Sequence, residues 1–247
     1  MLGVALTLIS TLAFSLNSVI ARRGLAVATA SAGAFITVLM GVPLFFVAAL
    51  ATGQLFNAGQ VSLNGYVLLS AAGVLHFGIG RYFNYRAAAA IGATRAQIVQ
   101  ALVIPYAILI AWLFLDEDVT LIMGFGIGLI LVGPSIMIQR GAKQAVPATV
   151  SSGGSTETGH TAPKMPAFQL RQVEGYLSAI ATIGAYGTSP ILIRAALRDT
   201  DDISIFGGFV AYVAASAVLL LLLVHPSRRG LISALHPATV RLFLGAG

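Results

Sequence analysis

Apolar residues in this chain form long continuous runs rather than alternating with polar residues. A helix of about 20 apolar residues crosses the hydrocarbon layer of a bilayer. Windows of that length without Lys, Arg, Asp or Glu cover Leu2–Ala21, Ser31–Ala51, Ala96–Leu115, Val119–Gln139, Gly175–Ile193 and Ile203–His225. A further run, Gly65–Gly80, continues into Arg81 and Arg86 and predicts a helix to about Ala88. Because membrane β-strands are about 10 residues long and alternate in polarity, the pattern favours helices. It predicts an all-α, multi-pass transmembrane helical bundle.

The composition agrees with a membrane protein. Only 9% of the residues are charged and 57% are hydrophobic, whereas soluble domains carry about 25% charged residues. The net charge is +6, but the basic residues stand beside the apolar runs, where Lys and Arg anchor membrane helices. We therefore expect a lipid bilayer and no nucleic acid as partners. The chain has no cysteine, which excludes disulfides and thiolate metal sites.

A polar, flexible segment and an internal repeat divide the chain. The sequence between 141 and 172 is rich in Gly, Ser, Thr and Pro, which is typical of a solvated linker. A shift of 172 residues places Gly3 on Gly175, Phe14 on Tyr186 and Arg22 on Arg194. Residues 1–140 thus form a first repeat and residues 173–247 a second.

The first repeat contains five predicted helices. Since five is odd, consecutive repeats must cross the membrane in opposite senses, as in the inverted repeats of secondary transporters. The second repeat stops within its third helix, where a last apolar stretch begins near Thr239. We expect two inverted five-helix repeats, of which the second is incomplete.

The first repeat resembles a known family, the EamA-type ten-helix members of the drug/metabolite transporter superfamily. The resemblance rests on Ala87–Ala90 at a helix end, Pro105 inside the next helix, Glu117 after it, and Gly124 and Gly128 in the fifth helix. It implies a carrier of small molecules that works by alternating access, in the inner cell membrane. It also implies a cavity built mainly by helices 1, 3 and 4 and their second-repeat partners.

The end of the third predicted helix carries most of the candidate chemistry. His76, Arg81, Asn84, Tyr85 and Arg86 fall within a short stretch. A charged side chain within a membrane faces a cavity or a partner unless it reaches the headgroups. Arg81 would favour an anionic or zwitterionic substrate if it faces the cavity, and both readings stay open for it and for Arg86. His76 could carry a proton or remain neutral and hydrogen-bonded.

Other helices contribute further polar candidates. Asn17 lies in the first apolar run, where a buried amide needs partners, either on a neighbouring helix or in the cavity. Gln100 could face the cavity entrance. Tyr186 and Ser189, the repeat partners of Phe14 and Asn17, would line the opposite wall. The predicted substrate-binding residues are Asn17, His76, Arg81, Asn84, Tyr85, Gln100, Tyr186 and Ser189.

These features predict a secondary transporter of small organic solutes that are amino-acid-like or anionic. We expect neither catalytic residues nor a metal or cofactor, and none of the apolar windows holds a carboxylate. The alternatives are a non-transporting membrane scaffold or receptor and an intramembrane enzyme. The charge distribution places the N-terminus outside, whereas the family resemblance implies cytoplasmic termini. Orientation, ion or proton coupling and oligomeric state stay open.

Overall fold

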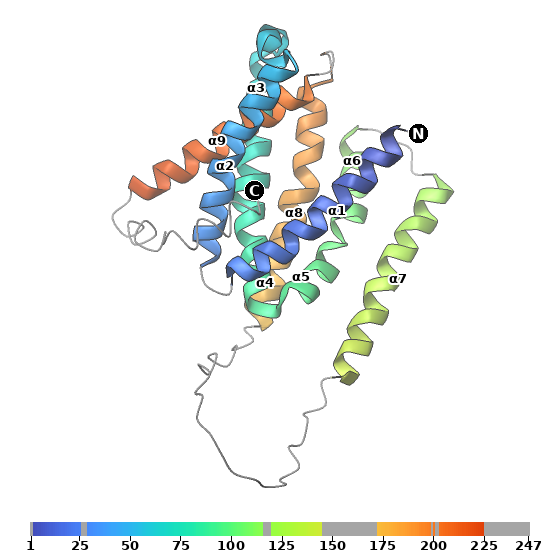
Figure 1. Ribbon diagram of the computed structural model, residues 1–247. Helices are drawn as coiled ribbons and strands as arrows, with labels where there is room; N and C mark the ends of the chain where they lie inside the picture. The colour runs from blue at the N-terminus through green and yellow to red at the C-terminus, as the bar shows by residue number, and fades with distance from the viewer. Residues whose placement is uncertain are drawn as a thin grey trace, which may run out of the picture.

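The computed structural model describes residues 2–25, 29–115, 120–144, 172–198, 200 and 203–224. These residues are helical or lie in short connections, so the predicted all-α, multi-pass bundle is confirmed (Figure 1). Glu117 with its acidic neighbours Asp116 and Asp118, most of the predicted linker and the stretch near Thr239 lie outside the described residues.

The helices follow the apolar runs closely. Their bounds are α1 (Leu2–Leu25), α2 (Ala30–Ala51), η1 (Gln54–Gln60), α3 (Leu63–Gly73), η2 (Val74–Gly80), α4 (Arg81–Ile91), α5 (Ala93–Gln100), α6 (Val103–Leu115), α7 (Leu121–Gln144), α8 (Gln172–Ala196) and α9 (Ser204–Val224). Within the described part of the chain, five helical stretches are long and apolar enough to cross a membrane: Ala30–Ala51, Leu63–Ile91, Ala93–Phe114, Gln172–Ala196 and Ser204–Leu222. The first and fifth predicted helices contribute shorter apolar stretches, Thr7–Ala21 and Leu121–Val132.

Two predicted helices are less regular than the sequence suggested. The third predicted helix consists of α3, the π-helical segment η2 and α4 in one continuous path. The fourth is divided into α5 and α6 just before Pro105, whose missing N–H cannot bond to the carbonyl of Ala101. Both irregularities lie close to the polar candidates, at His76 and Gln100.

Local capping explains where several helices start. At the start of α2, the Thr29 side chain accepts a hydrogen bond from the backbone N–H of Ala32 at 3.2 Å. At the start of α3, the Ser62 side chain accepts one from the backbone N–H of Gly65 at 3.1 Å. The start of α9 is capped from far along the chain, because Gln54 Oε1 accepts the N–H groups of Ile205 and Phe206. That buried amide ties η1 to α9.

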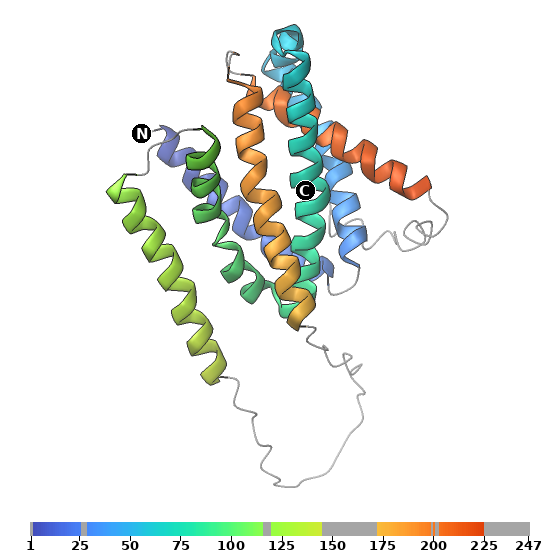
Figure 2. The same ribbon diagram turned by 180° about the vertical axis from the view of Figure 1, so that it is seen from behind.

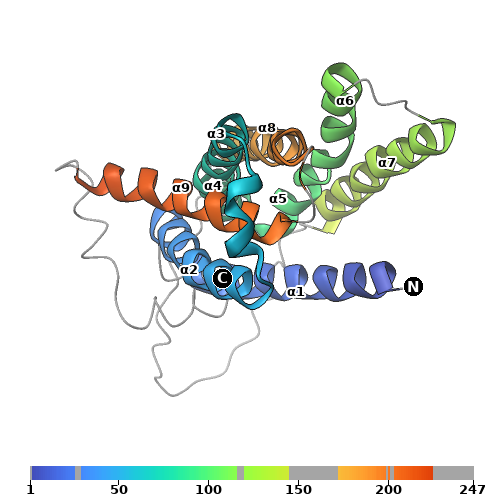
Figure 3. The ribbon, with the colours of Figure 1, turned by 90° about the horizontal axis from the view of Figure 1, so that it is seen from above.

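The centre of the bundle is built by α2, α3, η2, α4, α8 and α9. Figures 1 and 2 show α8 and the α3–η2–α4 path side by side, with α9 crossing α2 and α3 near one end. Seen from above, α1 and α7 extend away from this centre (Figure 3). The consecutive helices α6 and α7 accordingly have little packing between them. Large apolar residues of α7, such as Leu121 and Phe125, are exposed, as expected for a helix that meets lipid.

Small residues allow the central helices to approach closely. A Cβ added at Gly73 of α3 would lie 2.1 Å from the backbone oxygen of Ala211 in α9. One added at Gly175 of α8 would lie 2.3 Å from Ile91 Cγ2 at the end of α4. This is the close packing through small residues that stabilises helix pairs in lipid.

Candidate functional site

A polar network lies between η2–α4 and α8, within apolar helices. His76 Nδ1 is 2.7 Å from Ser189 Oγ, and the His76 ring stacks on Tyr186 with centroids 4.4 Å apart. Ser189 Oγ also donates to the Tyr186 carbonyl at 3.2 Å. A hydroxyl has one proton to donate, so this bond requires Nδ1–H of His76 to donate to Ser189. The Nε2 atom of that tautomer is an acceptor.

Two amides extend the network to the fourth predicted helix. Gln100 Nε2, at the end of α5, donates to Asn84 Oδ1 at 2.9 Å. Asn84 Nδ2 in turn donates to the Tyr186 hydroxyl at 3.3 Å. The structure thus brings five of the predicted residues into one connected set on η2, α4, α5 and α8: His76, Asn84, Gln100, Tyr186 and Ser189.

Arg81 adjoins this set and faces α9. Its Nη2 donates to the Tyr212 hydroxyl at 3.2 Å, and its guanidinium lies 5.3 Å from the centre of the Phe77 ring. Phe77 and Tyr212 stack with centroids 3.7 Å apart. The contacts are those of a cation held by aromatic faces and one hydroxyl.

The position of Arg81 along its helix places it deep in the membrane. The span that contains it, Leu63–Ile91, has its middle at Phe77, four residues from Arg81, which at 1.5 Å per residue is about 6 Å. A hydrocarbon layer of about 30 Å extends about 15 Å to each side of its middle, so Arg81 lies within it. Among the described residues the only carboxylate is Glu174, and it pairs with Arg86 rather than with Arg81. The interior of the described bundle therefore holds a positive charge without a neighbouring carboxylate.

Two further predicted residues, Tyr85 and Asn17, have partners or positions on other sides of their helices. Tyr85 is buried and packs with Ala21, Ala34 and Ile36, on the side of α4 that meets α1 and α2. Asn17 of α1 is half-buried, and the network of His76, Asn84 and Gln100 does not include it. Tyr85 is nevertheless near enough to Arg81 and Tyr186 to interact electrostatically with both.

Arg86 lies toward the end of α4 and forms an ion pair. Its Nε is 2.7 Å from Glu174 Oε1, and its Nη1 donates to the Tyr82 hydroxyl at 3.3 Å. The expectation of spans without a carboxylate was too strict, because α8 begins at Gln172 and its span includes Glu174. The sequence window began one residue later, at Gly175. The pair joins α4 to α8 at one end of the bundle.

Glycines make room for the aromatic rings of the site. A Cβ at Gly80 would lie 2.5 Å from Tyr186 Cε1, and one at Gly41 would lie 2.0 Å from Tyr212 Cε1. A Cβ at Gly187 would likewise collide with the ring of Tyr106. The hydroxyl of Tyr106 is 3.2 Å from Thr188 Oγ1. Each ring therefore lies directly over the backbone of the facing helix.

Sequence reasoning missed Tyr212, Tyr106, Thr188 and Glu174 as partners in these contacts. A hydroxyl-bearing ring inside an apolar run, as at Tyr212, is the signal that could have been used, because a buried tyrosine needs a partner for its hydroxyl. The described residues bring together no group of three His, Asp or Glu side chains that could hold a metal ion.

Comparison with known proteins identifies the family. The comparison with curated proteins found no match. The model of the EamA-like transporter family matches residues 1–139, which is more than half of the 247 residues and includes His76, Arg81, Asn84 and Gln100. The chain belongs to the EamA-like transporter family of the drug/metabolite transporter superfamily.

Proposed function

We propose that this protein is a secondary transporter that moves small organic solutes across the cell membrane by alternating access. The substrate class that fits best carries an anionic or zwitterionic group, as an amino acid does. Membership of a transporter family supports the carrier, and it disfavours both an intramembrane enzyme and a non-transporting scaffold or receptor. The charge of the site supports the substrate class.

Arg81 is the observation on which the substrate class rests. An arginine at mid-membrane depth is costly unless it has a partner, and the described partners of Arg81 are neutral: the Tyr212 hydroxyl and two aromatic faces. A carboxylate or phosphate that enters the bundle would form a charge-assisted bond with the guanidinium, which is roughly twice as strong as a neutral hydrogen bond.

The polar network beside Arg81 can bind the parts of the solute that Arg81 does not contact. Asn84 and Gln100 offer amide groups that can exchange their mutual bond for bonds to a substrate. His76 is the histidine of this polar set, and it is our candidate for proton coupling. Tyr85 and Asn17 stay in the proposal as members of the surrounding wall.

The test is uptake by proteoliposomes that contain the purified protein. We expect uptake of some members of a panel of labelled amino acids and organic anions, and we expect cationic drugs to be transported poorly. Arg81→Gln should lower the affinity for the transported anion about tenfold or more, and Arg81→Lys should restore part of it. Arg95→Gln, at the start of α5, is the matched control.

Two results would count against the proposal. If Arg81→Gln transported anions as well as the unchanged protein, Arg81 would not bind the substrate. If the unchanged protein transported nothing from the panel yet bound one of its members, the receptor alternative would be favoured. Uptake that depends on a pH gradient and is lost in His76→Gln would support proton coupling.

A further inference from the structure

Tyr212 of α9 is in direct contact with the guanidinium of Arg81. Its hydroxyl oxygen accepts a hydrogen bond from Arg81 Nη2 at 3.2 Å, and the central carbon of the guanidinium lies 5.8 Å from the centre of its ring. The two residues come from distant parts of the chain, because α4 belongs to the first predicted repeat and α9 to the second. The contact therefore joins the two repeats at the depth of Arg81.

Packing fixes the ring of Tyr212 in place. The residue is 7% exposed, and its ring stacks on Phe77 and on Phe45, with centroids 3.7 Å and 5.0 Å apart. A Cβ at Gly41 would overlap the ring, so the ring also lies against the backbone of α2. The hydroxyl cannot turn away from Arg81 unless these neighbours move.

Arg81 and Tyr212 both keep donors that their mutual bond does not use. A guanidinium carries five N–H donors, and within the described part of the chain the Tyr212 oxygen is the acceptor for one of them. The Tyr212 hydroxyl also donates through its own O–H, for which the described residues supply no acceptor. A bond accepted from a cation strengthens the bond that the same hydroxyl donates. The two side chains can therefore donate together to one anion.

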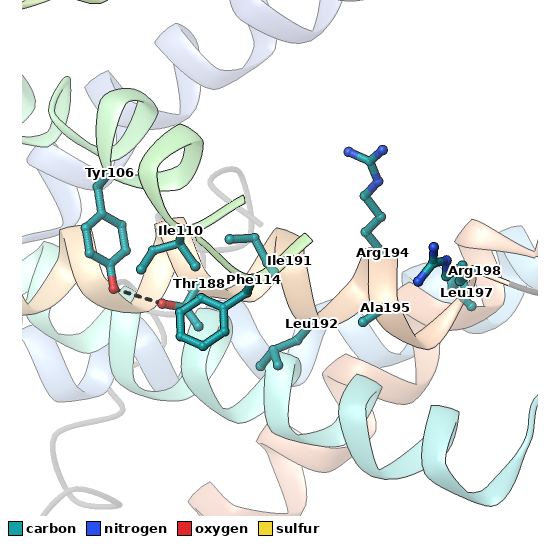
Figure 4. Close-up of a pocket in the computed structure, with 10 residues that line it drawn as sticks. All are labelled: Tyr106, Ile110, Phe114, Thr188, Ile191, Leu192, Arg194, Ala195, Leu197 and Arg198. Atoms are coloured by element: carbon teal, nitrogen blue, oxygen red, sulfur yellow. Dashed lines mark hydrogen bonds between the residues drawn. The ribbon is translucent and has the colours of Figure 1, made fainter. Parts of the chain in front are cut away.

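Other tyrosine hydroxyls in the bundle bond to neutral groups. Tyr106 lines a separate groove between α6 and α8, and its hydroxyl lies 3.2 Å from Thr188 Oγ1 (Figure 4). Tyr66 of α3 donates to the carbonyl oxygen of Ala58 at 3.0 Å. The partner of Tyr212 is instead a cation, so its hydroxyl lies where an anion would be attracted.

Tyr82 offers the best comparison, because its hydroxyl also accepts from an arginine. Arg86 Nη1 donates to it at 3.3 Å, and the same arginine is paired through Nε with the carboxylate of Glu174 at 2.7 Å. At Arg81 the arginine and the tyrosine hydroxyl are both present, but no carboxylate of the described residues accompanies them. The missing member of the second group is an anion, which a solute can supply.

We propose that Tyr212 is a second substrate-binding residue, whose hydroxyl donates a hydrogen bond to the anionic group that Arg81 binds. This inference rests on the role of Arg81 in the proposed function. Arg81 Nη2 and the Tyr212 hydroxyl are 3.2 Å apart, so the two oxygens of one carboxylate can each lie within hydrogen-bonding distance of one donor. Because packing already holds the ring, little side-chain freedom is lost when the solute binds. The bound solute connects α4 with α9, and with them the two predicted repeats.

The test measures how well a carboxylate protects Arg81 from chemical modification. Methylglyoxal is a small, uncharged reagent for guanidinium groups, and Arg81 is half-buried rather than fully enclosed. The purified protein in detergent is treated with this reagent and increasing amounts of acetate, or of acetamide, which has the same shape without the charge. Sodium chloride keeps the ionic strength constant. Chymotrypsin cleaves after aromatic residues, so a fragment that ends at Tyr82 reports on Arg81 separately from Arg86 in the mass spectrum.

We expect acetate to protect Arg81 and acetamide to protect it far less. In Tyr212→Phe the acetate concentration that gives half-protection should rise about tenfold, because one hydrogen bond to a charged group is lost. Tyr66→Phe is the matched control, since it also removes one tyrosine hydroxyl with a described partner, the Ala58 carbonyl. It should leave the concentration for half-protection unchanged. The modification rate without acetate is measured for each variant.

A second measurement retains both the ring and the hydroxyl. Incorporation of 3-fluorotyrosine at position 212 makes the phenol a stronger donor and a weaker acceptor, at a pH at which the hydroxyl remains protonated. If Tyr212 donates to the anion, acetate should protect Arg81 at a lower concentration. Unchanged or weaker protection would mean that the hydroxyl serves only as an acceptor for Arg81. This measurement stands even if Tyr212→Phe fails to fold.

The outcomes separate this inference from the proposed function. Equal half-protection of Arg81 in Tyr212→Phe and in the unchanged protein would overturn the role of Tyr212 and leave Arg81 as an anion site. No protection by acetate in the unchanged protein would contradict the role of Arg81 itself, and the role of Tyr212 with it. An equally large effect in Tyr66→Phe would assign the change to a general loss of packing, which also overturns the inference.

Discussion

Gly80 allows the sharpest test of the packing at the polar network. A Cβ at this position would lie 2.5 Å and 2.6 Å from two atoms of the Tyr186 ring and 3.1 Å from the Leu75 carbonyl oxygen. Van der Waals contact between carbons requires about 3.5 Å or more, so Gly80→Ala must move the ring by about 1 Å. Such a movement disturbs both the stacking of Tyr186 on His76 and its bond from Asn84.

Gly78, two residues away in the same π-helical segment, is the matched control. A Cβ there would meet only Val74 Cγ1, at the ordinary contact distance of 3.9 Å. Both substitutions gain the same conformational stabilisation of the backbone, since alanine is more favourable than glycine within a helix by about 0.5–1 kcal/mol. The difference between them isolates the clash, which by comparison with overpacked cores should destabilise Gly80→Ala by about 1–3 kcal/mol relative to Gly78→Ala.

The assay is reversible unfolding of the two variants in mixed detergent micelles, together with transport of whichever solute the protein carries. Replacing Tyr186 by Leu in the Gly80→Ala background should recover part of the lost stability, because the smaller side chain leaves room for the new methyl group. Equal stability of Gly80→Ala and Gly78→Ala would refute the close approach of Tyr186 to η2. A Gly80→Ala, Tyr186→Leu protein whose loss of stability equals the sum of the two single losses would refute it as well.

Three further substitutions test single contacts by the same unfolding measurement. Tyr212→Phe keeps the ring but removes the hydroxyl that accepts from Arg81 at 3.2 Å, and it should cost about 1.5 kcal/mol; an unchanged stability would contradict this bond. Glu174→Gln weakens the half-exposed pair with Arg86, and it should cost under about 1 kcal/mol and lose its effect in high salt. Ser216→Ala should be neutral or slightly stabilising, because among the described residues the buried Ser216 Oγ has no hydrogen-bond partner; a loss above about 1 kcal/mol would reveal a partner.

Long apolar runs made most of the fold predictable. A run without charge has one stable arrangement in a bilayer, since a helix satisfies its own backbone. The helix α2, predicted as Ser31–Ala51 and found as Ala30–Ala51, shows that the apolar run alone is enough to predict the bounds of such a helix. The ends of α8 were harder, because Glu174 lies within the helix and its charge is compensated by Arg86 from α4.

The π-helical turn of η2 was not predictable from periodicity. The stretch Val74–Gly80 is apolar and glycine-rich apart from His76, so its hydrophobic pattern does not distinguish a π-helical turn from an α-helical one. The segment contacts residues from elsewhere in the chain: Tyr186 lies over Gly80, Ser189 lies at His76 and Tyr212 stacks on Phe77. All three come from α8 and α9, more than 100 positions along the chain.

The internal repeat predicted equivalent faces but could not predict equivalent surroundings. Asn17 and Ser189 occupy matching positions, and both were expected to line the cavity. Ser189 is fully buried and contacts His76, because α8 is packed against α3, η2, α4 and α6. The described contacts of α1 are fewer and are made with α2 and α4, and Asn17 stays half-buried. A repeat therefore places a polar side chain on the correct side of its helix, whereas the helices packed around it decide whether that side is enclosed.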